Sequence, residues 1–469
     1  MAEEDIIKAR KEHLNWFLEN SIDPYPAKVP KSDDAGEIIS RFQKDETSFD
    51  ACVSGRVTAI RKMGKASFAE VFSNFKKIQI YIKRDDDQNN YEIFRRTDIG
   101  DFVNVAGFVF RTKMGEITVH VKRLLLICKA FRPLPEKWHG LKDEETILRR
   151  RYLDILTNEK SREIFLKRSS VISEIRKFLN GKNYVEVETP LLQSIPGGAE
   201  AEPFKTHHKA LDIDLFLRIA PELYLKRLIV AGFEKIYEIG RNFRNEGIST
   251  RHNPEFTMLE LYCAYADYGD MMNLCEEIVK RSAEIISGET VFSEAFARVS
   301  IFECLKEKTG IDFKGNLGRD NLRAQAEKLG ISFEKDAPPA KIFENIYEEV
   351  ILKDMGMPVF LMDFPEEFSP LAKPRCGTPI AERFELYINN MEIANAYSEL
   401  NDPVRQRAHF ASQADVSGKE QIDEDFLEAL EYGMPPTGGL GIGIDRLIMA
   451  LSGSQSIKDV IIFPQLKSR

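Results

Sequence analysis

The chain has 469 residues, more than the roughly 250–300 residues at which a single hydrophobic core stops growing, so we expect at least two domains. Hydrophobic residues make up 43% of the sequence and charged residues 30%, which excludes a disordered or fibrous protein. No apolar run approaches the length of about 18 residues that a membrane-spanning helix needs, and the charged N-terminal segment lacks the pattern of a secretory signal. The six cysteines form no C-x-x-C pair, which argues against a disulfide framework and a structural zinc site. We therefore expect a cytoplasmic protein that crosses no membrane.

The net charge of −9 is unevenly spread along the chain. Residues 51–140 contain 17 Lys and Arg against 9 Asp and Glu, so this segment carries +8 and the remainder −17. A basic module joined to an acidic body is typical of a protein that contacts a polyanion with one part and holds a cationic or metal-bound ligand with the other. A basic face that is merely solvated is the alternative that the count leaves open.

The N-terminal third predicts a small barrel behind a helical extension. Residues 1–50 should contain an amphipathic helix over 1–20 and a short helix near 34–44. Five strands in about 80 residues favour a barrel of the oligonucleotide-binding kind. The Pro-containing segment 131–141 is the expected linker. Alternating patterns separated by Gly, Asn and Asp turns predict the strands at 51–63, 66–73, 77–84, 102–113 and 116–127.

Beyond residue 141, helices and strands alternate irregularly. Apolar residues recur at helical spacing over 161–182, the helix should stop at Gly181, and a strand that ends at Pro190 should follow. Charged helical stretches occupy about 270–355. A Gly-rich block, PPTGGLGIGIDRLIMALSG, lies near the C-terminus.

Residues 237–262, YEIGRNFRNEGISTRHNPEFTMLELY, predict an antiparallel hairpin with a charged loop. Arg244 offers a planar fork of donors to a phosphate, and Glu246, on the same face, can accept from an adenine amino group. Phe256 is placed to stack on the base. For Arg-x-Glu alone, an ordinary exposed hairpin with an ion pair remains the alternative.

The segment GLGIGIDRL at 439–447 predicts a strand of small residues that lets a ligand or another backbone approach before Arg446 opens a helix. It lacks the third glycine and the βαβ unit of a dinucleotide fingerprint. Alone, its glycines are equally well a packing device.

Taken together and in this order, these elements resemble the class II aminoacyl-tRNA synthetases, and among them the bacterial-type lysyl-tRNA synthetases. The resemblance runs along essentially the whole chain. Its first motif is matched near 161–190, its second near 236–262 around Phe243–Glu246, and its third near 438–452 around Gly441–Arg446.

The resemblance implies an α+β multidomain fold. We expect an N-terminal helical extension over 1–50 and a five-stranded OB-fold β-barrel that binds the anticodon over 51–140. A class II catalytic domain with a mostly antiparallel sheet flanked by helices should occupy 141–469, with a helical insertion near 270–355. The first motif builds the dimer interface in the family, so a homodimer is expected.

The activity implied is that of a lysine–tRNA ligase, with L-lysine, ATP and tRNA-Lys as partners. Lysine is first joined to AMP with release of pyrophosphate, and is then transferred to the 3′-terminal adenosine of the tRNA. Arg244 should brace the α-phosphate and Arg446 the γ-phosphate as the catalytic residues. The ATP-binding residues implied are Arg244, Glu246, His252, Asn253, Phe256 and Arg446, although a lone loop histidine such as His252 is as often structural.

A buried lysine side chain must meet carboxylates, and the sequence supplies them. In the family, the positions of Glu222 and Glu399 hold the ε-ammonium group and that of Glu260 holds the α-amino group. Such a site rejects leucine or methionine, which would leave the carboxylates buried and unpaired. For any one of these glutamates taken singly, a position on a solvated helix or strand face is the more common interpretation. The full lysine-binding set implied is Gly198, Glu222, Glu260, Tyr262, Asn395, Tyr397 and Glu399.

Glu385 and Glu392 are assigned by the resemblance to Mg²⁺. Their spacing of seven would place them on opposite faces of one straight strand, and a turn at Asn389–Asn390 brings them back to one face. Magnesium suits a site with few oxygen ligands, because it keeps waters and uses substrate phosphates.

In the barrel, the positions that match the family's anticodon readers are Arg61, Phe68, Gln79 and Glu116. Aromatic stacking combined with polar edges is how single-stranded bases are recognised. A place in the barrel core is the alternative for Phe68.

The loop PGGAEAEPFKTHHKALDID departs from the family pattern. Glu200 and Glu202 stand where small or basic residues are expected, and Lys209 stands where asparagine is expected. These departures put loop closure and substrate affinity in doubt.

Three alternative functions are disfavoured by features of the sequence. An aspartyl or asparaginyl synthetase is disfavoured by Glu222 and Glu399, because an acidic side chain needs a basic pocket. A lysine ligase that modifies a protein would lack the barrel. A catalytically silent RNA-binding relative would be free to lose Arg244, Glu385 and Arg446, which are present.

Overall fold

The computed structural model describes residues 3–135, 143–199, 201–355, 357–417 and 422–467. The chain divides into two compact units, Met1–Leu141 and Lys142–Arg469. The predicted domain boundary between residues 140 and 141 falls in a segment outside the described residues.

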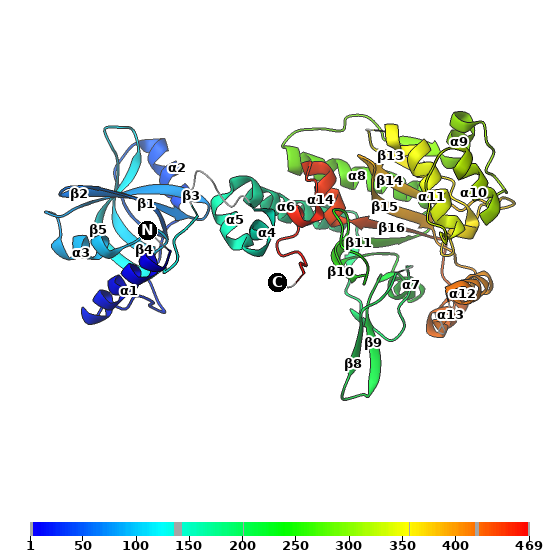
Figure 1. Ribbon diagram of the computed structural model, residues 1–469, viewed down its shortest axis with the longest axis horizontal. Helices are drawn as coiled ribbons and strands as arrows, with labels where there is room; N and C mark the ends of the chain where they lie inside the picture. Colours follow the sequence, from blue (N-terminus) through cyan, green and yellow to red (C-terminus); the bar gives the residue numbers. More distant parts are fainter. Residues whose placement is uncertain (1–2, 136–142, 200, 356, 418–421, 468–469) are drawn as a thin grey trace. The chain divides into compact units, whose positions relative to one another are not determined.

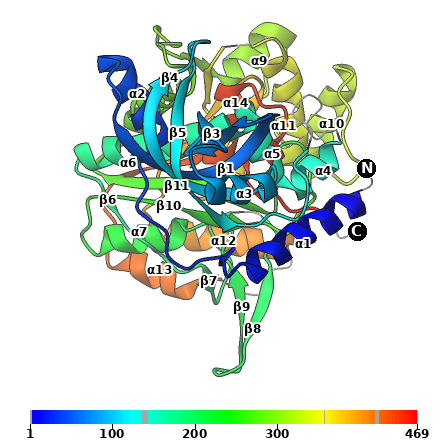
Figure 2. The ribbon, with the colours of Figure 1, turned by 90° about the vertical axis from the view of Figure 1, so that its left-hand side faces the viewer.

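The first unit is a closed barrel with two preceding helices (Figures 1 and 2). The strand order is β1-β2-β3-β5-β4, and the five predicted strands are confirmed. A short helix between β3 and β4, α3, was not predicted. The elements are α1 (Glu3–Glu19), α2 (Ala35–Asp45), β1 (Asp50–Met63), β2 (Ala66–Ser73), β3 (Lys76–Lys83), α3 (Gln88–Arg96), β4 (Phe102–Arg111) and β5 (Ile117–Cys128).

Alternation along the strands fills the barrel with aliphatic side chains. In β3, for example, Ile78, Ile80 and Ile82 are buried while the residues between them are not. Gly107 allows β4 to approach β5, because a Cβ there would overlap the carbonyl oxygen of His120.

A buried cation joins the end of the barrel to the residues before β4. The ammonium group of Lys129 is fully buried, 2.5 Å from Asp98 Oδ2 and 2.7 Å from Asp101 Oδ2. His13 lies 2.8 Å from Asp98 Oδ2, and the amides of Asp98 and Ala130 donate to Asp101. These bonds satisfy a charged cluster that would otherwise be costly to bury.

The second unit is built on a mostly antiparallel eight-stranded sheet of order β12-β13-β14-β15-β16-β11-β10-β6, and a three-stranded sheet of order β7-β9-β8 lies beside it. Only β6 with β10 and β12 with β13 pair in parallel. The strands are β6 (Val185–Glu186), β7 (Leu192–Gln193), β8 (Lys205–His208), β9 (Ile213–Leu217), β10 (Lys235–Phe243), β11 (Glu255–Ala264), β12 (Ala297–Ser300), β13 (Val359–Met362), β14 (Arg383–Ile388), β15 (Met391–Ser398) and β16 (Thr437–Gly443).

One face of this sheet is covered by helices and forms the main core. Alternate residues such as Leu259, Phe384 and Ile442 pack with side chains of α6 (Glu159–Gly181), α8 (Tyr268–Ser287) and α14 (Ile444–Ser452). The predicted helix over 161–182, with its end at Gly181, is confirmed by α6. The intervening residues of the same strands face the other way and are free for a site.

The remaining helices lie in several groups around the sheet (Figure 1). Within the range 270–355, α8 packs into the main core, β12 joins the sheet, and α9–α11 share a core cluster of their own. The range therefore contains both sheet elements and a helical group. The bounds are α4 (Glu144–Arg149), α5 (Arg151–Thr157), α7 (Glu222–Val230), α9 (Ile301–Thr309), α10 (Arg319–Lys328), α11 (Pro339–Val350), α12 (Pro403–Ser417), α13 (Glu424–Glu431), α15 (Ile457–Val460) and the 3₁₀ turns Leu352–Asp354 and Glu366–Phe368.

Among the described residues, no helix combines the length and the apolar character needed to span a membrane.

We predict that Lys129→Met destabilises the barrel by about 3–5 kcal/mol, because it leaves Asp98 and Asp101 without their shared cation. Hydrogen exchange of the barrel amides at neutral pH measures the loss. The control is Lys83→Met, which removes a solvent-exposed contact of 3.9 Å with Asp86 and should cost less than about 1 kcal/mol. Equal protection in both variants would contradict the prediction.

Candidate active site

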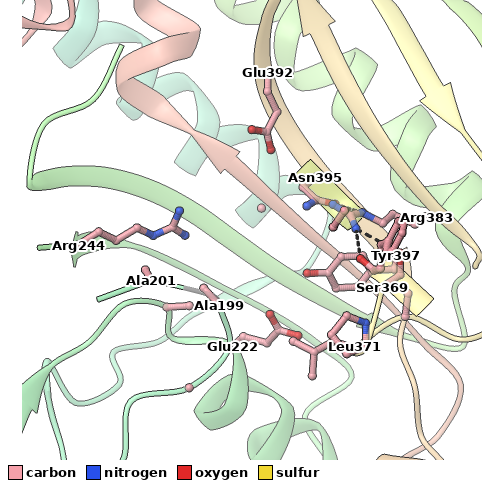
Figure 3. A pocket seen from close by; sticks show the side chains of 18 of the residues that line it. Ala199, Ala201, Glu222, Arg244, Ser369, Leu371, Arg383, Glu392, Asn395 and Tyr397 are labelled. Atoms are coloured by element: carbon pink, nitrogen blue, oxygen red, sulfur yellow. Dashed lines mark hydrogen bonds between the residues drawn. The ribbon is translucent and has the colours of Figure 1, made fainter. Parts of the chain in front are cut away.

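A cavity of about 1570 Å³ opens on the face of the eight-stranded sheet opposite the main core. Figure 3 shows Arg244 on one side of it and Arg383, Asn395 and Tyr397 on the other, with Glu222 between the two sides. The cavity brings together residues that lie more than 250 positions apart in the sequence, from Ile195 to Ile457, which is typical of a ligand site.

The floor of the cavity is a strand with almost no side chains. Gly441 of β16 lies between Glu260 of β11 and Asn395 of β15, and Gly439 lies between Tyr262 and Tyr397. A Cβ on Gly439 would overlap Glu399 Oε1 and come within 2.7 Å of the Tyr262 ring. The glycines therefore leave room for the polar side chains on either side, as a packing device would, and the approach of a ligand to this strand stays a prediction.

The β14–β15 hairpin carries one wall of the site. Asn389 and Asn390 both have positive φ, at 51° and 58°, so they form the predicted tight turn. Tyr387 pairs with Glu392, and Glu385 therefore shares the face of Glu392. One additional residue, Ile393, then shifts the register by a bulge.

The bulge adds the rest of β15 to that same face. After it, Glu385 pairs with Asn395 and Arg383 pairs with Tyr397. Four of the predicted site residues on this hairpin therefore point to one side of the sheet.

Glu222 and Glu399 meet at the end of the cavity, although they come from the first turn of α7 and the end of β15. Their side chains are 5% and 0% exposed, and the ammonium group of Lys226 lies 2.6 Å from Glu222 Oε1 and 2.5 Å from Glu399 Oε2. Burial raises the pKa of Glu399, and the two carboxylates hold the pKa of Lys226 above its ordinary value. Lys226 escaped prediction, although its spacing of four from Glu222 places both on one helix face.

Gly198 lies against this pair. It has a φ of +83°, and a Cβ there would come within 3.1 Å of Glu222 Cβ. Both the backbone conformation and the contact favour glycine.

Glu260 and Tyr262 occupy the opposite side of the glycine floor. Tyr262 donates a hydrogen bond of 3.4 Å to Glu260 Oε2. Burial, together with the negative charge of Glu222, raises the pKa of Glu260 to about 8, while Arg218 and Arg244 oppose the shift.

Arg244 leaves the end of β10 and points into the cavity (Figure 3). Its guanidinium lies 5.2 Å from the centre of the Phe256 ring, and its buried Nε has no hydrogen-bond partner among the described residues. Glu246 is exposed and also lines the cavity. The predicted hairpin is confirmed, because β10 and β11 pair without a register shift.

Arg446 and His252 meet at the other end of the cavity. Arg446 donates to Glu392 Oε2 at 3.1 Å, and its Nη2 lies 2.9 Å from His252 Nε2. Burial and the positive charges of Arg446 and Arg244 lower the pKa of His252. The neutral ring therefore accepts from Arg446 and keeps its proton on Nδ1, which lies 2.9 Å from Ser249 Oγ.

Asn253 lines the cavity but is nearly buried. Its amide donates to the carbonyl of Glu255 at 2.6 Å, and its oxygen accepts from Gln465 N at 3.4 Å. These bonds hold the end of the loop against the start of β11.

Arg383 is a further residue of the site that sequence reasoning missed. It donates to Asn395 Oδ1 at 3.2 Å, to Glu385 Oε1 at 2.6 Å and to Ser369 Oγ at 3.2 Å. The alternation of β14 was the available signal, since Arg383 and Glu385 lie two residues apart on one strand.

Glu385 is more enclosed than the sequence suggested. Its second oxygen accepts from Tyr387 at 2.7 Å, and burial, with Glu392 adding and Arg383 opposing, raises its pKa to about 7. Glu392 lines the cavity, whereas Glu385 lies behind its surface. Among the described residues, no group of three or more His, Cys, Asp or Glu side chains is arranged to hold a metal ion.

The four barrel residues predicted to contact RNA do not lie in the barrel core. Arg61 pairs with Phe68 across β1 and β2, and Gln79 accepts a 2.9 Å hydrogen bond from Thr118. Glu116 is exposed just before β5. Phe68 is half-buried on the outer face, where its ring begins an aromatic cluster that sequence reasoning missed: Phe68, Tyr81, Phe108, Phe110 and His120.

Of the departures in the loop before β8, Glu200 lies outside the described residues. Glu202 lines the cavity, and its carbonyl accepts from Asn245 N at 2.7 Å. Lys209 is exposed in the turn between β8 and β9, a hairpin that projects from the second unit (Figures 1 and 2), and it does not line the cavity.

Comparison with known proteins matches both units. A family described as tRNA synthetases class II (D, K and N) matches residues 143–467, and an OB-fold nucleic acid binding domain matches residues 51–127. Similar curated proteins include the lysine–tRNA ligases of Pelotomaculum thermopropionicum, 48% identical over 99% of this chain and 95% of the relative, and of Moorella thermoacetica, 47% identical over 100% and 99%. The lysine–tRNA ligase of Bacillus subtilis is 45% identical over 99% of this chain and 98% of its own length. The chain belongs to the class II tRNA synthetase family of the D, K and N type.

Proposed function

We propose that the chain is a lysine–tRNA ligase, which activates L-lysine with ATP and transfers it to the 3′-terminal adenosine of tRNA-Lys. The observation that carries the proposal is the pair of buried carboxylates, Glu222 and Glu399, at the end of the cavity. The names of the relatives, which match along nearly the whole chain, support the same reaction.

The carboxylates also separate lysine from the other amino acids of the family. Aspartate would bring a third negative charge to Glu222 and Glu399, and asparagine would bring them no cation beyond that of Lys226. Lysine brings an ammonium group to Glu399, whose carboxylate accepts from no described residue apart from its ion pair with Lys226.

The two ends of the amino acid then bind different elements. Glu222 and Glu399 hold the ε-ammonium group, while Glu260, with its partner Tyr262, receives the α-ammonium group. Asn395 and Tyr397 stand between them on β15, and Gly198 lets the loop backbone approach. Arg383 donates a hydrogen bond to Asn395 Oδ1 and so fixes the orientation of its side chain.

The cationic side chains in the cavity suit ATP. Phe256 offers a ring to adenine and Glu246 an acceptor to its amino group, while Asn253 holds the loop between them. Arg244 braces the α-phosphate, and Arg446, supported by His252, binds the γ-phosphate.

The first step forms a bond between a lysine carboxylate oxygen and the α-phosphorus and breaks the bond to pyrophosphate. The lysine carboxylate is already ionised, so the protein needs to position the two substrates and neutralise charge. Arg244 and Arg446 act on the developing charge at the two ends of the triphosphate. The ribose hydroxyl of the tRNA then attacks the carbonyl carbon of the adenylate and displaces AMP.

We propose that Glu392, which lines the cavity, and Glu385, which lies behind its surface, hold a Mg²⁺ ion. They share one face of the hairpin, and their mutual repulsion contributes to the raised pKa of Glu385. Two carboxylates without a third protein ligand suit a cation that completes its shell with phosphate oxygens and water. When bound, Mg²⁺ would neutralise charge on the phosphates.

The barrel is the proposed anticodon reader. Its aromatic cluster presents half-buried rings on the outer face, and stacking on such rings binds unpaired bases. Arg61, Gln79 and Glu116 supply polar groups beside Phe68.

We also propose a homodimer and a cytoplasmic location. Leu166, Val185, Leu191 and Leu192 are each nearly half exposed around α6 and β6, and a second copy of the chain would cover them. All six cysteines are free thiols, which suits a reducing compartment. Light scattering of the purified chain tests the dimer.

Exchange of labelled pyrophosphate into ATP, measured with each of the twenty amino acids and Mg²⁺ but without RNA, tests the proposed function. Exchange with lysine alone is the expected result. Exchange with another amino acid, or with none, would overturn the proposal.

We predict that Glu399→Gln raises the KM for lysine by at least about tenfold, because it removes a buried carboxylate from the ammonium group. The KM for ATP should stay unchanged, and discrimination against methionine should fall. Unchanged discrimination would count against the assignment of the side-chain pocket.

Lysine binding should be pH-dependent through Glu260. Its pKa of about 8 means that the empty pocket holds a proton below that pH, whereas the α-ammonium group binds the ionised carboxylate. Lysine affinity should therefore rise by up to about tenfold per pH unit as the pH approaches 8, with release of a proton. Calorimetry in buffers of different protonation enthalpy measures that proton, and Glu260→Gln should reduce it. An affinity independent of pH across this range would refute the assignment.

Phe68→Ala should slow tRNA charging by about tenfold or more and leave lysine-dependent pyrophosphate exchange unchanged, because the ring stacks on a base and lies outside the catalytic unit. Phe75→Ala, which removes an exposed ring of the same barrel, is the matched control. Equal loss of charging and exchange in Phe68→Ala would exclude an anticodon role.

A further inference from the structure

Lys226 has no part in the reaction described above, although it touches both carboxylates of the side-chain pocket. We propose that Lys226 is a resident counter-ion that sets the charge of the Glu222–Glu399 pair, so that one monocationic side chain completes it. The inference rests on the proposed function and makes Lys226 a positioning residue that determines specificity.

The ammonium group of Lys226 lies behind the pocket and not in it. Its side chain is fully buried, within 2.6 Å of Glu222 and 2.5 Å of Glu399, and it does not line the cavity, whereas both glutamates do. A substrate can therefore reach the outer sides of the carboxylates without displacing Lys226.

Lys226 is held there by apolar packing of its helix. Its neighbour Leu225 and Ile229 belong to a buried cluster with Tyr262 of β11 and Phe426 of α13. The helix that carries Lys226 is thus packed against β11 and α13, and the Lys226 side chain is fully buried.

The charges in this corner do not balance without a ligand. Two ionised carboxylates and one ammonium group leave one negative charge in this buried corner, which is costly, and burial accordingly raises the pKa of Glu399. Nearby cations are already engaged, because Arg383 binds Glu385 and Arg227 binds Asp423. Glu260, the remaining acidic group, lies across the glycine floor and is assigned to the α-ammonium group.

A second buried lysine, Lys129, offers a comparison, because the carboxylates around it have all the donors they need within the protein. Lys129 also lies between two carboxylates, but there His13 and two backbone amides supply further donors. Apart from the ion pair with Lys226, Glu399 accepts no hydrogen bond from the described residues. The Lys226 cluster is therefore open on the side that faces the cavity.

The proposed charge balance predicts that a second substitution restores lysine affinity that the first one lowers. Glu399→Gln leaves Glu222 neutralised by Lys226, so an incoming ammonium group meets no net charge and is repelled by Lys226. Adding Lys226→Met removes that repulsion and returns the pocket to a single negative charge. The double variant should then bind lysine more tightly than Glu399→Gln alone.

The experiment compares the wild type, Glu399→Gln, Lys226→Met and the double variant by equilibrium binding of lysine and by the KM values for lysine and ATP in pyrophosphate exchange. We expect lysine affinity to fall by on the order of tenfold in Glu399→Gln, which loses an attracting charge, and to rise in Lys226→Met, which loses a repelling one. It should recover by a similar factor from Glu399→Gln to the double variant, with the KM for ATP constant throughout. Lys306→Met, which removes an exposed pair with Asp312, is the control and should change neither value.

If Lys226 only holds α7 in place, the second substitution will weaken lysine binding further, and that result overturns the inference. Unchanged lysine affinity in Lys226→Met overturns it as well. Circular dichroism and ATP affinity identify a variant that fails to fold, and Lys226→Arg, which keeps the charge, then replaces Lys226→Met and should retain discrimination against methionine. The proposed function is judged separately, by whether the wild type exchanges pyrophosphate with lysine alone.

Discussion

The alternation of side chains across the eight-stranded sheet is the constraint on which the site depends. Leu259, Phe384 and Ile442 face the helices and hold the core together. On the other face, their neighbours Glu260 and Gly441 line the cavity, and Glu385 lies behind its surface. Each strand thus contributes to stability and to the site at once, and the two contributions are separated only by the direction in which a side chain points.

Because the two faces of the sheet have separate roles, the cavity face can carry many buried charges. The apolar face supplies the free energy of folding, so the other face can bear carboxylates with raised pKa values, such as Glu260 and Glu385. Most of these charges have a partner within the protein, as Glu385 has Arg383 and Glu222 has Lys226. Arg244, whose Nε has no hydrogen-bond partner among the described residues, and Glu399, whose only such partner is Lys226, both line the cavity, where ligands of opposite charge are expected.

Much of this arrangement could be predicted from the sequence. The barrel strands, the hairpin of β10 and β11, and the turn at Asn389–Asn390 follow from alternation and turn residues, which act over short distances. The family resemblance supplied the candidate residues at the two ends of the lysine site. What could not be predicted depends on contacts between distant segments.

Lys226 and Arg383 illustrate the limit. A lysine on a charged helix and an arginine on a strand are usually solvated, and only the packing of α7 and β14 against other elements buries them beside carboxylates. The aromatic cluster on the barrel was missed for a related reason. Its rings come from four strands, and their meeting depends on how the barrel closes.

The single additional residue in β15 has a wider consequence for how the two substrates are brought together. Before Ile393 the strand carries Glu392, on the side of the proposed metal and phosphates, and after it come Asn395 and Tyr397, on the side of the amino acid. Without the bulge, the period of two would send these two groups to opposite surfaces of the sheet. Ile393 thus keeps the residues proposed for the nucleotide and those proposed for the amino acid on one face of the sheet.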